Sequence, residues 1–497
     1  AGATLAPEFM TRNFTRDNLQ SAIFSQNNFL PFYSSMIGVG HMIGRTKLMK
    51  DFSTSGAMQS MFVSMDRAYF AKDVKKYFTG GRMRNAVTNP LEMLRVMSEI
   101  FETAPRVGEY ALTYKKLKRM KEKEGFSDRD IIQASGFNAR DITIDFAKMG
   151  SQIQAINRIS AFFNARLQGY AKIYDAFKTR PLQTAGLIGA YITLPSVFLW
   201  MKNHDDPRYQ ALPEWQKDLF WIVITGDGTL EDGDYTAYRI PKPFELGLLF
   251  GTGAEKMLDF AKDKDPQAIT DFLFNFLKDS GGGIVPIPDF VKPGIELFAN
   301  RSFFTDRPIV PRYLEDVLPE YQYNDYTSET AKFLGAFISE TTDGAMGSPA
   351  KIEHVIRSWT STLGSYGLQA MDSILEKQGI VSPPTQPSDT LADLPVIKAF
   401  VVRQPTAGSQ FITDFYKEFD KIKGRMDTVR KLRNDNRGLE AMSVLEKTDL
   451  TLLPLIELQK TLSGHSKMVR QIYKAEDITA PEKRQLIDTL YRSMILL

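Results

Sequence analysis

RPLQTAGLIGAYITLPSVFLWMKNHDDPRYQALPEWQKDLFW, residues Arg180 to Trp221, is the stretch that decides the fold. Its first half, from Pro181 to Met201, has no charged residue and matches the ~20 residues that a helix needs to cross a bilayer. Its second half, from Asn203 onward, concentrates carboxylates, prolines and tryptophans, which favours a fixed polar corner. The nature of the first half therefore bears directly on function.

Two sets of side chains in this stretch are candidate site residues. The polar corner is expected to consist of Asp205, Asp206, Arg208, Trp215 and Trp221. Contact with lipid or with the core is expected of Leu187, Ile188, Tyr191, Phe198 and Trp200. Because Pro195 breaks the apolar run and Gly186 and Gly189 favour close helix contact, we predict the buried central helix of a soluble module. Lipid contact then requires the module to open.

The composition is that of a globular chain with several domains. The 497 residues suffice for about two to four domains, and a mean hydropathy of -0.25 is too polar for a polytopic membrane protein. The net charge is only +3, so any contact with nucleic acid has to be local. The chain has no cysteine, which excludes disulfides and thiol nucleophiles, and its four histidines are far apart. No catalytic residue, cofactor or metal is therefore assigned.

Residues 1–90 are predicted to form an N-terminal region of short helices. The first residues, AGATLAPEFM, do not resemble a secretory signal, and the missing initial methionine is typical of a trimmed chain or a fragment. Methionines such as Met36, Met42 and Met58 are either core residues or an adaptable partner surface. The glycines near them do not match GxGxxG, so no nucleotide site is predicted.

Residues 91–380 are predicted to form a helical core module. One helix starts at Pro90 after the capping residue Asn89, and Pro105 begins the next one. That second helix ends in the basic stretch KKLKRMKEKE, Lys115 to Glu124, which either contacts phosphates or is a solvated helix face. The candidates for phosphate contact are Lys115, Lys116, Lys118, Arg119, Arg158 and Arg166.

One small β-hairpin is predicted at about residues 219–240. Two β-prone segments, Leu219–Thr225 and Tyr235–Ile240, flank the loop GDGTLEDGD, which contains an Asp-Gly turn signal. The loop fails the calcium-binding EF-hand template, because Gly233 is at the seventh position instead of the sixth and no glutamate follows at the twelfth. We expect a solvated turn.

A segment rich in proline, serine and threonine separates this module from the C-terminal part. Residues 381–408, which begin VSPPTQPSDTLADLP, are predicted to be a linker. Residues 409–497 are predicted to form a C-terminal helical arm that serves oligomerisation or docking, or is a plain helical hairpin. The predicted fold class is therefore mainly α, with a multi-helix module, one small hairpin and a C-terminal arm.

An ordered series of short motifs resembles a known family. The motifs are FFNARLQG (162–169), LPS (194–196), LW (199–200), DDPRY (205–209), LPEW (212–215), DLFW (218–221), RIPKPFELG (239–247), ANRSFF (299–304), RPIVP (307–311) and YTSE (326–329). The series, within residues 13–376, is similar to a large polyvalent-protein-associated domain of giant bacteriophage virion and ejection proteins. The resemblance implies a largely helical, virion-packaged module delivered into the host with the genome, and it implies no catalytic residues.

The leading hypothesis is a non-enzymatic structural module of an internal virion (ejection) protein. It would lie in the virion interior as a homo-oligomer beside portal or other ejection proteins, and it would help to form a conduit for the genome in the host cell envelope. The alternatives are an envelope-degrading or nucleic-acid-processing enzyme that uses carboxylates such as Asp205 and Asp206, and a virion protein that binds packaged DNA. Contact with the host membrane is expected to be conditional.

Overall fold

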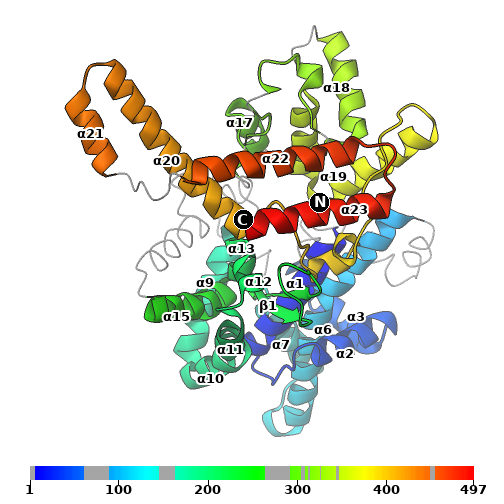
Figure 1. Ribbon diagram of the computed structural model, residues 1–497. Coiled ribbons are helices and arrows are strands. Elements are labelled where there is room, and N and C mark those ends of the chain that lie inside the picture. Colours follow the sequence, from blue (N-terminus) through cyan, green and yellow to red (C-terminus); the bar gives the residue numbers. More distant parts are fainter. Residues whose placement is uncertain are drawn as a thin grey trace. The chain divides into compact units, whose positions relative to one another are not determined.

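The computed structural model describes residues 6–60, 89–144, 163–263, 291–303, 308–311, 314–324, 326–342, 346–447 and 454–497. Over these residues the fold is mainly α with one two-stranded sheet, which confirms the predicted class (Figure 1). The chain divides into two compact units. The first contains Ala1–Phe198 and Ile240–Val381, and the second contains Leu199–Arg239 and Ser382–Leu497. The chain therefore leaves the first unit, returns to it, and ends in the second.

The first unit is built from helices. Its α-helices are α1 (Pro7–Phe24), α2 (Tyr33–Ile43), α3 (Lys47–Thr54), α6 (Pro90–Glu124), α7 (Asp128–Asp141), α9 (Phe163–Thr179), α10 (Pro181–Ile188), α14 (Phe244–Gly247), α15 (Gly253–Asp263), α17 (Lys292–Phe298), α18 (Glu329–Thr341) and α19 (Pro349–Lys377). Short helices η1 (Ala57–Ser60) and η7 (Pro319–Tyr321) and two π-helical turns, η3 (Gly189–Thr193) and η4 (Leu248–Thr252), lie between them. The helix α11 (Leu194–Asn203) continues α10 and η3.

Pro105 lies inside α6, which corrects the prediction that a new helix begins there. A proline removes one backbone hydrogen bond and crowds the preceding turn, so it normally ends or kinks a helix. Around it, however, α6 buries Ala104, Val107 and Tyr110 in a core with Met42 and other residues of the N-terminal helices. Packing of this face keeps α6 continuous across the proline.

The crossing of α2 and α6 depends on two glycines. A Cβ atom on Gly38 would lie 2.1 Å from the carbonyl oxygen of Ala104, and one on Gly108 would lie 2.3 Å from that of Ser34. The two backbones therefore approach as closely as glycine alone allows. Gly38 is thus a packing residue within a helix.

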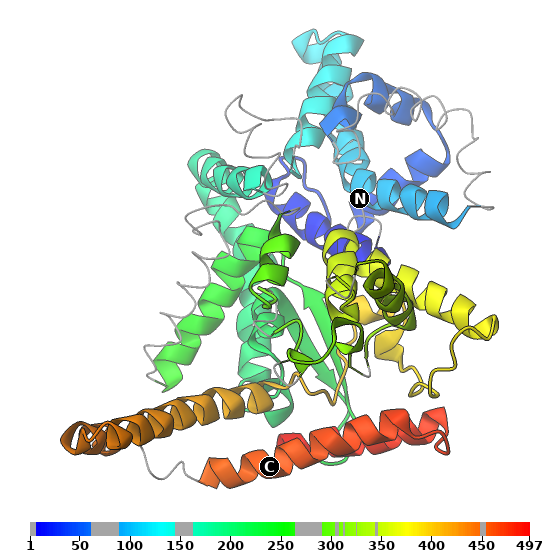
Figure 2. The same ribbon diagram turned by 90° about the horizontal axis from the view of Figure 1, so that it is seen from above.

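The second unit joins the hairpin to the C-terminal helices. Its elements are α12 (Pro207–Gln210), α13 (Glu214–Leu219), β1 (Phe220–Thr225), β2 (Thr236–Pro241), η8 (Leu391–Asp393), η9 (Ile397–Ala399), α20 (Gln410–Asn434), α21 (Gly438–Glu446), α22 (Pro454–Lys474) and α23 (Ala480–Leu496). The strands β1 and β2, the arrows in Figure 2, confirm the predicted hairpin. Phe220, Ile222 and Ile224 alternate along β1 and form a core with Leu212 and Val402.

Most of the predicted linker is attached along its length to the second unit. The amide of Val402 donates to the Ala237 carbonyl at 2.8 Å, so the segment extends the hairpin beside β2. The buried Lys483 ammonium donates to the carbonyl of Thr385 at 2.9 Å, and Arg484 Nε donates to that of Ser388 at 2.7 Å. Residues 382–408 therefore form a strap with fixed partners, and we call them the strap below.

Candidate functional site: the apolar helix and the polar corner

The apolar half of the 180–221 stretch forms one helix, Pro181–Asn203, made of α10, η3 and α11. It has 23 residues, and its most apolar window of 18 residues has a mean hydropathy of 1.4, so it is the one helix within the described ranges that is long and apolar enough to cross a membrane. The helix continues through Pro195. The π-turn η3 directly precedes the α11 turn that contains Pro195, and such a widened turn relieves the crowding that a proline ring causes.

One face of this helix is held by the first unit. The buried residues Thr184, Ile188, Ile192 and Ser196 recur at every fourth position. The Thr184 hydroxyl donates to the Ala176 carbonyl at 3.0 Å, which anchors the start of the helix to α9. These contacts define the protein-facing side of the helix.

The two π-turns of the first unit meet on this side. The hydroxyl of Thr193 in η3 donates to the carbonyl of Phe250 in η4 at 3.0 Å. Next to this bond, a Cβ atom on Gly251 would lie 2.8 Å from the Ser196 hydroxyl oxygen. Both helices therefore widen at their point of contact, and the contact requires a residue without a side chain.

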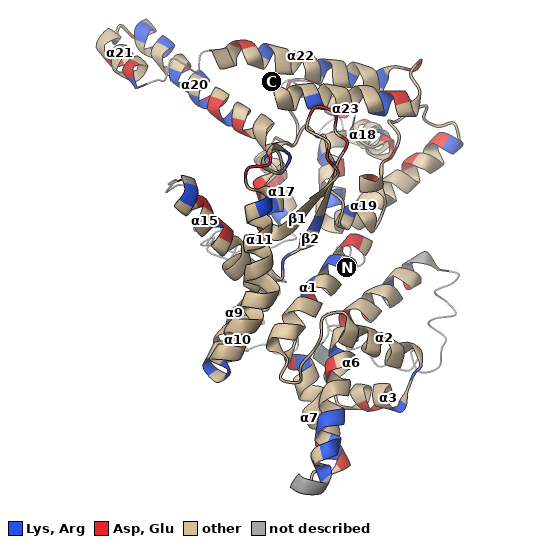
Figure 3. Cartoon of the chain, turned by 60° about the horizontal axis from the view of Figure 1, so that its bottom comes forward, with Lys and Arg blue, Asp and Glu red and all other residues tan. Residues whose placement is uncertain are grey.

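The opposite face of the helix is exposed and apolar, which corrects the prediction of a buried central helix. Only 22% of its most apolar window is buried. The exposed fractions are 88% for Leu182, 65% for Leu194, 66% for Phe198 and 72% for Met201. The solvent side of a helix in a soluble domain normally carries polar and charged residues. Here the ribbon of α10 has no charged residue along its length (Figure 3).

The residues predicted to contact lipid or core divide between these two faces. Ile188 is buried, Phe198 is exposed, and the side chains of Leu187, Tyr191 and Trp200 are half-buried. The sequence reasoning missed three apolar residues whose exposed fractions are similar to or larger than that of Phe198, namely Leu182, Leu194 and Met201. Stepping from Phe198 at helical spacing would have found them.

The polar corner is an arginine fork at the start of the second unit. Asp206 caps α12, because its Oδ1 accepts a hydrogen bond from the Arg208 amide at 2.8 Å. The guanidinium of Arg208 donates to the same carboxylate from Nε and Nη2, at 3.0 and 2.7 Å. Its Nη1 donates to the carbonyls of Gly226 at 3.0 Å and Gly228 at 2.8 Å, and its Cζ lies 5.4 Å from the centre of the Tyr235 ring. One arginine thus joins the α12 turn to the hairpin loop.

Two carboxylates of this region, those of Asp206 and Asp232, have a lowered pKa. Burial opposes ionisation of Asp206, but the hydrogen bonds from Arg208 outweigh it and lower the pKa of that carboxyl. In the hairpin loop, hydrogen bonds from the amides of Asp234 and Thr229, at 2.8 and 2.9 Å, lower the pKa of Asp232. A general acid needs a pKa near the working pH. These two carboxylates therefore act as acceptors for the backbone and for arginine.

The other predicted corner residues lie apart from this fork. The side chain of Asp205 is 83% exposed, and its Oδ1 lies 3.9 Å from His204 Nε2. Trp215 on α13 is half-exposed and meets the Phe220 ring edge-on, with the ring centres 6.3 Å apart. Trp221 is buried in β1. Of the predicted set, Asp206 and Arg208 form the fork.

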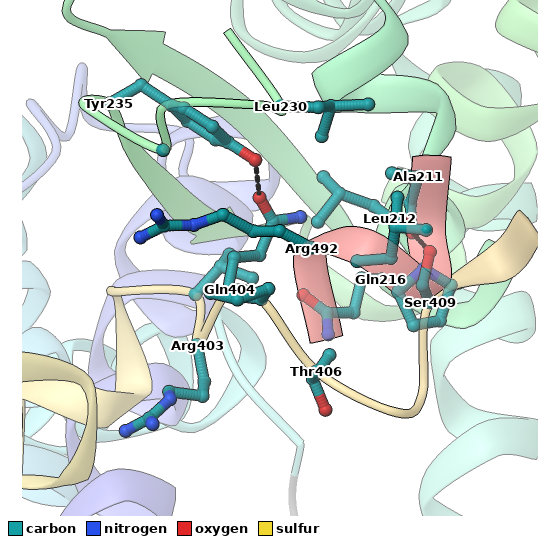
Figure 4. A pocket seen from close by; sticks show the side chains of 15 residues that line it. Ala211, Leu212, Gln216, Leu230, Tyr235, Arg403, Gln404, Thr406, Ser409 and Arg492 are labelled. Carbon is teal, nitrogen blue, oxygen red and sulfur yellow. Dashed lines mark hydrogen bonds between the residues drawn. The ribbon is translucent and has the colours of Figure 1, made fainter. Parts of the chain in front are cut away.

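The strap and the C-terminal arm attach to the same corner. The hydroxyl of Ser409 and the amide of Gln410 both donate to the Ala211 carbonyl, at 3.0 and 2.9 Å. The Tyr235 hydroxyl donates to the Gln404 side chain (Figure 4). Sequence reasoning missed these partners, since no local signal links positions so far apart in the chain.

A cavity of about 30 Å³ lies among these residues, lined by Leu212, Tyr235, Gln404 and Arg492 among others (Figure 4). It has room for roughly two water molecules, whereas sites for small organic ligands occupy ~300 Å³ or more. In its wall, Oε1 of Gln216 and Nε of Arg492 are buried without a hydrogen-bond partner and suit contact with enclosed water. The cavity is too small for a sugar or a nucleotide.

Four of the residues predicted to contact phosphate lie together. Lys115, Lys116, Lys118 and Arg119 are on the C-terminal half of α6, where blue bands crowd the helix in Figure 3. Arg158 lies outside the described residues, as does the side chain of Arg166. The described part of the chain contains no group of three acidic or histidine side chains placed to hold a metal ion.

Comparison with protein-family models picks out the region that begins at the polar corner. Residues 206–397 match large polyvalent protein associated domain 38. The match confirms the resemblance within residues 206–397 and indicates a phage-associated family, whereas the motifs at 162–169, 194–196 and 199–200 lie before the matched range. The domain 38 region, residues 206–397, starts at the capping residue Asp206, includes the hairpin and ends within the strap. Comparisons with curated proteins and with solved structures give no match.

Proposed function

We propose that the chain is a non-enzymatic structural module of a bacteriophage internal virion protein. It is packaged in the capsid and helps to form a conduit that delivers the genome across the host envelope. The observation that carries this proposal is the match of the domain 38 region to a phage-associated family. The uses of Asp206 and Arg208 support the structural part, because both side chains serve to fasten the backbone.

The C-terminal arm supports self-association of this module. The helices α20 and α21 form a hairpin, and on α21 the side chains of Leu439 and Met442 are 86% and 61% exposed. Exposed apolar side chains on a helical hairpin suit helix packing with a second copy. Portal or other ejection proteins are further proposed partners.

Detection of the protein in purified particles tests the proposal. Quantitative mass spectrometry of full particles and of particles that have released their DNA should find several copies in the first and far fewer in the second. The missing copies should appear in the envelope fraction of infected cells. A protein absent from purified particles would remove the proposal.

An activity test separates the enzymatic alternative. The isolated chain is expected to leave peptidoglycan and nucleic acid uncleaved. Cleavage that Asp205→Asn or Asp206→Asn abolishes, in variants with unchanged circular dichroism, would replace the structural proposal by the enzymatic one.

Binding of packaged DNA is a second candidate role, and the basic group on α6 favours it. Replacing Lys115, Lys116, Lys118 and Arg119 by glutamine should weaken duplex binding and lower the slope of log K against log salt by ~0.9 for each phosphate that is no longer neutralised. The control changes Lys431 and Arg433, basic residues of α20, in the same way. A slope equal in all three proteins would refute this role for α6.

A further inference from the structure

The exposed side of Pro181–Asn203 forms a continuous apolar stripe. Its members are Leu182, Gly186, Ala190, Leu194, Phe198 and Met201, all of them exposed. They lie opposite the buried positions, because residues two apart on a helix point in nearly opposite directions. A helix that is apolar all round belongs either in a protein core or in lipid. With 22% of its apolar window buried, this helix does not have the environment of a core helix.

The charges around the helix suit a lipid surface. The exposed side chains of Lys178 and Lys202 bracket it, and no acidic residue lies between them in the sequence. Arg180 is held by the protein instead, since it donates to the carbonyls of Ser25 at 2.7 Å and Phe24 at 2.9 Å. Lysines that flank an apolar helix reach the anionic phosphates of lipid headgroups. Between Lys178 and Lys202 the pattern is therefore apolar in the middle and basic at both ends, and the exposed carboxylates of Asp175 and Asp205 lie outside it in the sequence.

We propose that this stripe docks on a lipid bilayer while the chain stays folded, with the helix lying in the plane of the interface. Interfacial helices immerse one face by about 5–10 Å, which is enough to cover the stripe. On the other face, Thr184 keeps its bond to Ala176 and Thr193 keeps its bond to Phe250. A spanning helix would bring these polar groups into hydrocarbon without their partners.

This mode of docking needs no opening of the module, unlike the lipid contact expected from the sequence. It rests on the proposed function only in naming the host membrane as the natural surface.

Vesicle flotation of the full chain is the first test. The chain should float with vesicles of phosphatidylethanolamine and phosphatidylglycerol. Serine at Leu182, Leu194, Phe198 and Met201 together should lower the partition coefficient by about tenfold or more. The control places serine at Met257 and Phe298, which are 68% and 95% exposed on other helices, and should float like the parent. No flotation of the parent, or an equal reduction in both variants, would overturn the inference.

Site-specific labelling is the second test, and it measures orientation in the folded chain. Because the chain has no cysteine, a single cysteine at position 182, 194 or 198 can carry an environment-sensitive fluorophore. Vesicles should shift all three emissions to the blue, with equal depths in quenching by spin-labelled lipids. A label at position 298 should not respond. A steady change of depth from position 182 to position 198 would show a spanning helix and refute the in-plane arrangement.

The outcomes separate the two proposals. A chain that is present in particles but does not bind vesicles supports the proposed function and refutes docking on lipid. A chain that binds vesicles through the stripe but is absent from particles does the reverse.

Discussion

Replacing Arg208 by alanine tests whether the polar corner is a structural fastening. The change removes two hydrogen bonds to loop carbonyls, worth about 1 kcal/mol each, and the interaction with the Tyr235 ring, worth about 1 kcal/mol or less. The change also removes the ion pair between Arg208 and Asp206, whose side chains are 21% and 18% exposed, respectively. Because both partners are partly exposed, the ion pair adds at most about 1 kcal/mol. We expect the free energy of opening of the hairpin to fall by about 3 kcal/mol.

Hydrogen exchange is the appropriate measurement, because a chain with two units need not unfold in a single step. The amides of β1 and β2 should lose protection in Arg208→Ala. They should lose about half as much in Arg208→Lys, which keeps the charge without the planar fork. The control is Arg430→Ala on α20, where Arg430 is 78% exposed and pairs with Asp427 at 3.6 Å. A reduction below about 0.5 kcal/mol in Arg208→Ala would refute the fastening.

Three further predictions concern the rest of the fold. Burial raises the pKa of Asp17 from 3.8 to about 7, so the folded chain holds a proton between these pH values that the unfolded chain has released. The contribution of the Asp17 carboxyl to the free energy of unfolding therefore falls as the pH rises through that window. Asp17→Asn should flatten the profile of thermal stability against pH there. The control Asp175→Asn, at an exposed position, should leave the profile unchanged. Gly38→Ala should cost about 3 kcal/mol or more in chemical unfolding, because its Cβ meets the α6 backbone, and Gly40→Ala, with open space around it, should cost little. Lys483→Met removes two bonds to backbone carbonyls and should increase proteolysis within the strap, as measured by mass spectrometry of the fragments.

Elements with a strong local signal could be predicted from the sequence. The helix that begins at Pro90 after the capping residue Asn89 and the hairpin around the Asp-Gly turn are both confirmed. Each depends on residues only a few positions apart, such as a side chain that accepts from an amide three residues later. Such signals do not require knowledge of the rest of the chain.

The prediction that a helix begins at Pro105 was wrong, because the buried face of α6 packs against residues far away in the sequence and keeps the helix continuous. Pro195 also lies inside a helix, directly after a π-turn. The strap has the composition of a linker, yet its amides and carbonyls find partners on β2 and α23. Composition indicates the conformation that a segment favours in isolation. It does not identify the hydrogen-bond partners of the strap, because these partners lie far away in the sequence.

The same division holds for the stretch from Arg180 to Trp221. The sequence by itself determined that an uncharged helix would be followed by a polar turn and a hairpin, because charge, proline and turn signals are local properties. Only the tertiary structure decided that Asp206 and Arg208 hold the hairpin loop, and that one side of the helix is left exposed. Hydropathy measures how apolar a helix is, whereas exposure depends on which other elements pack against each of its faces.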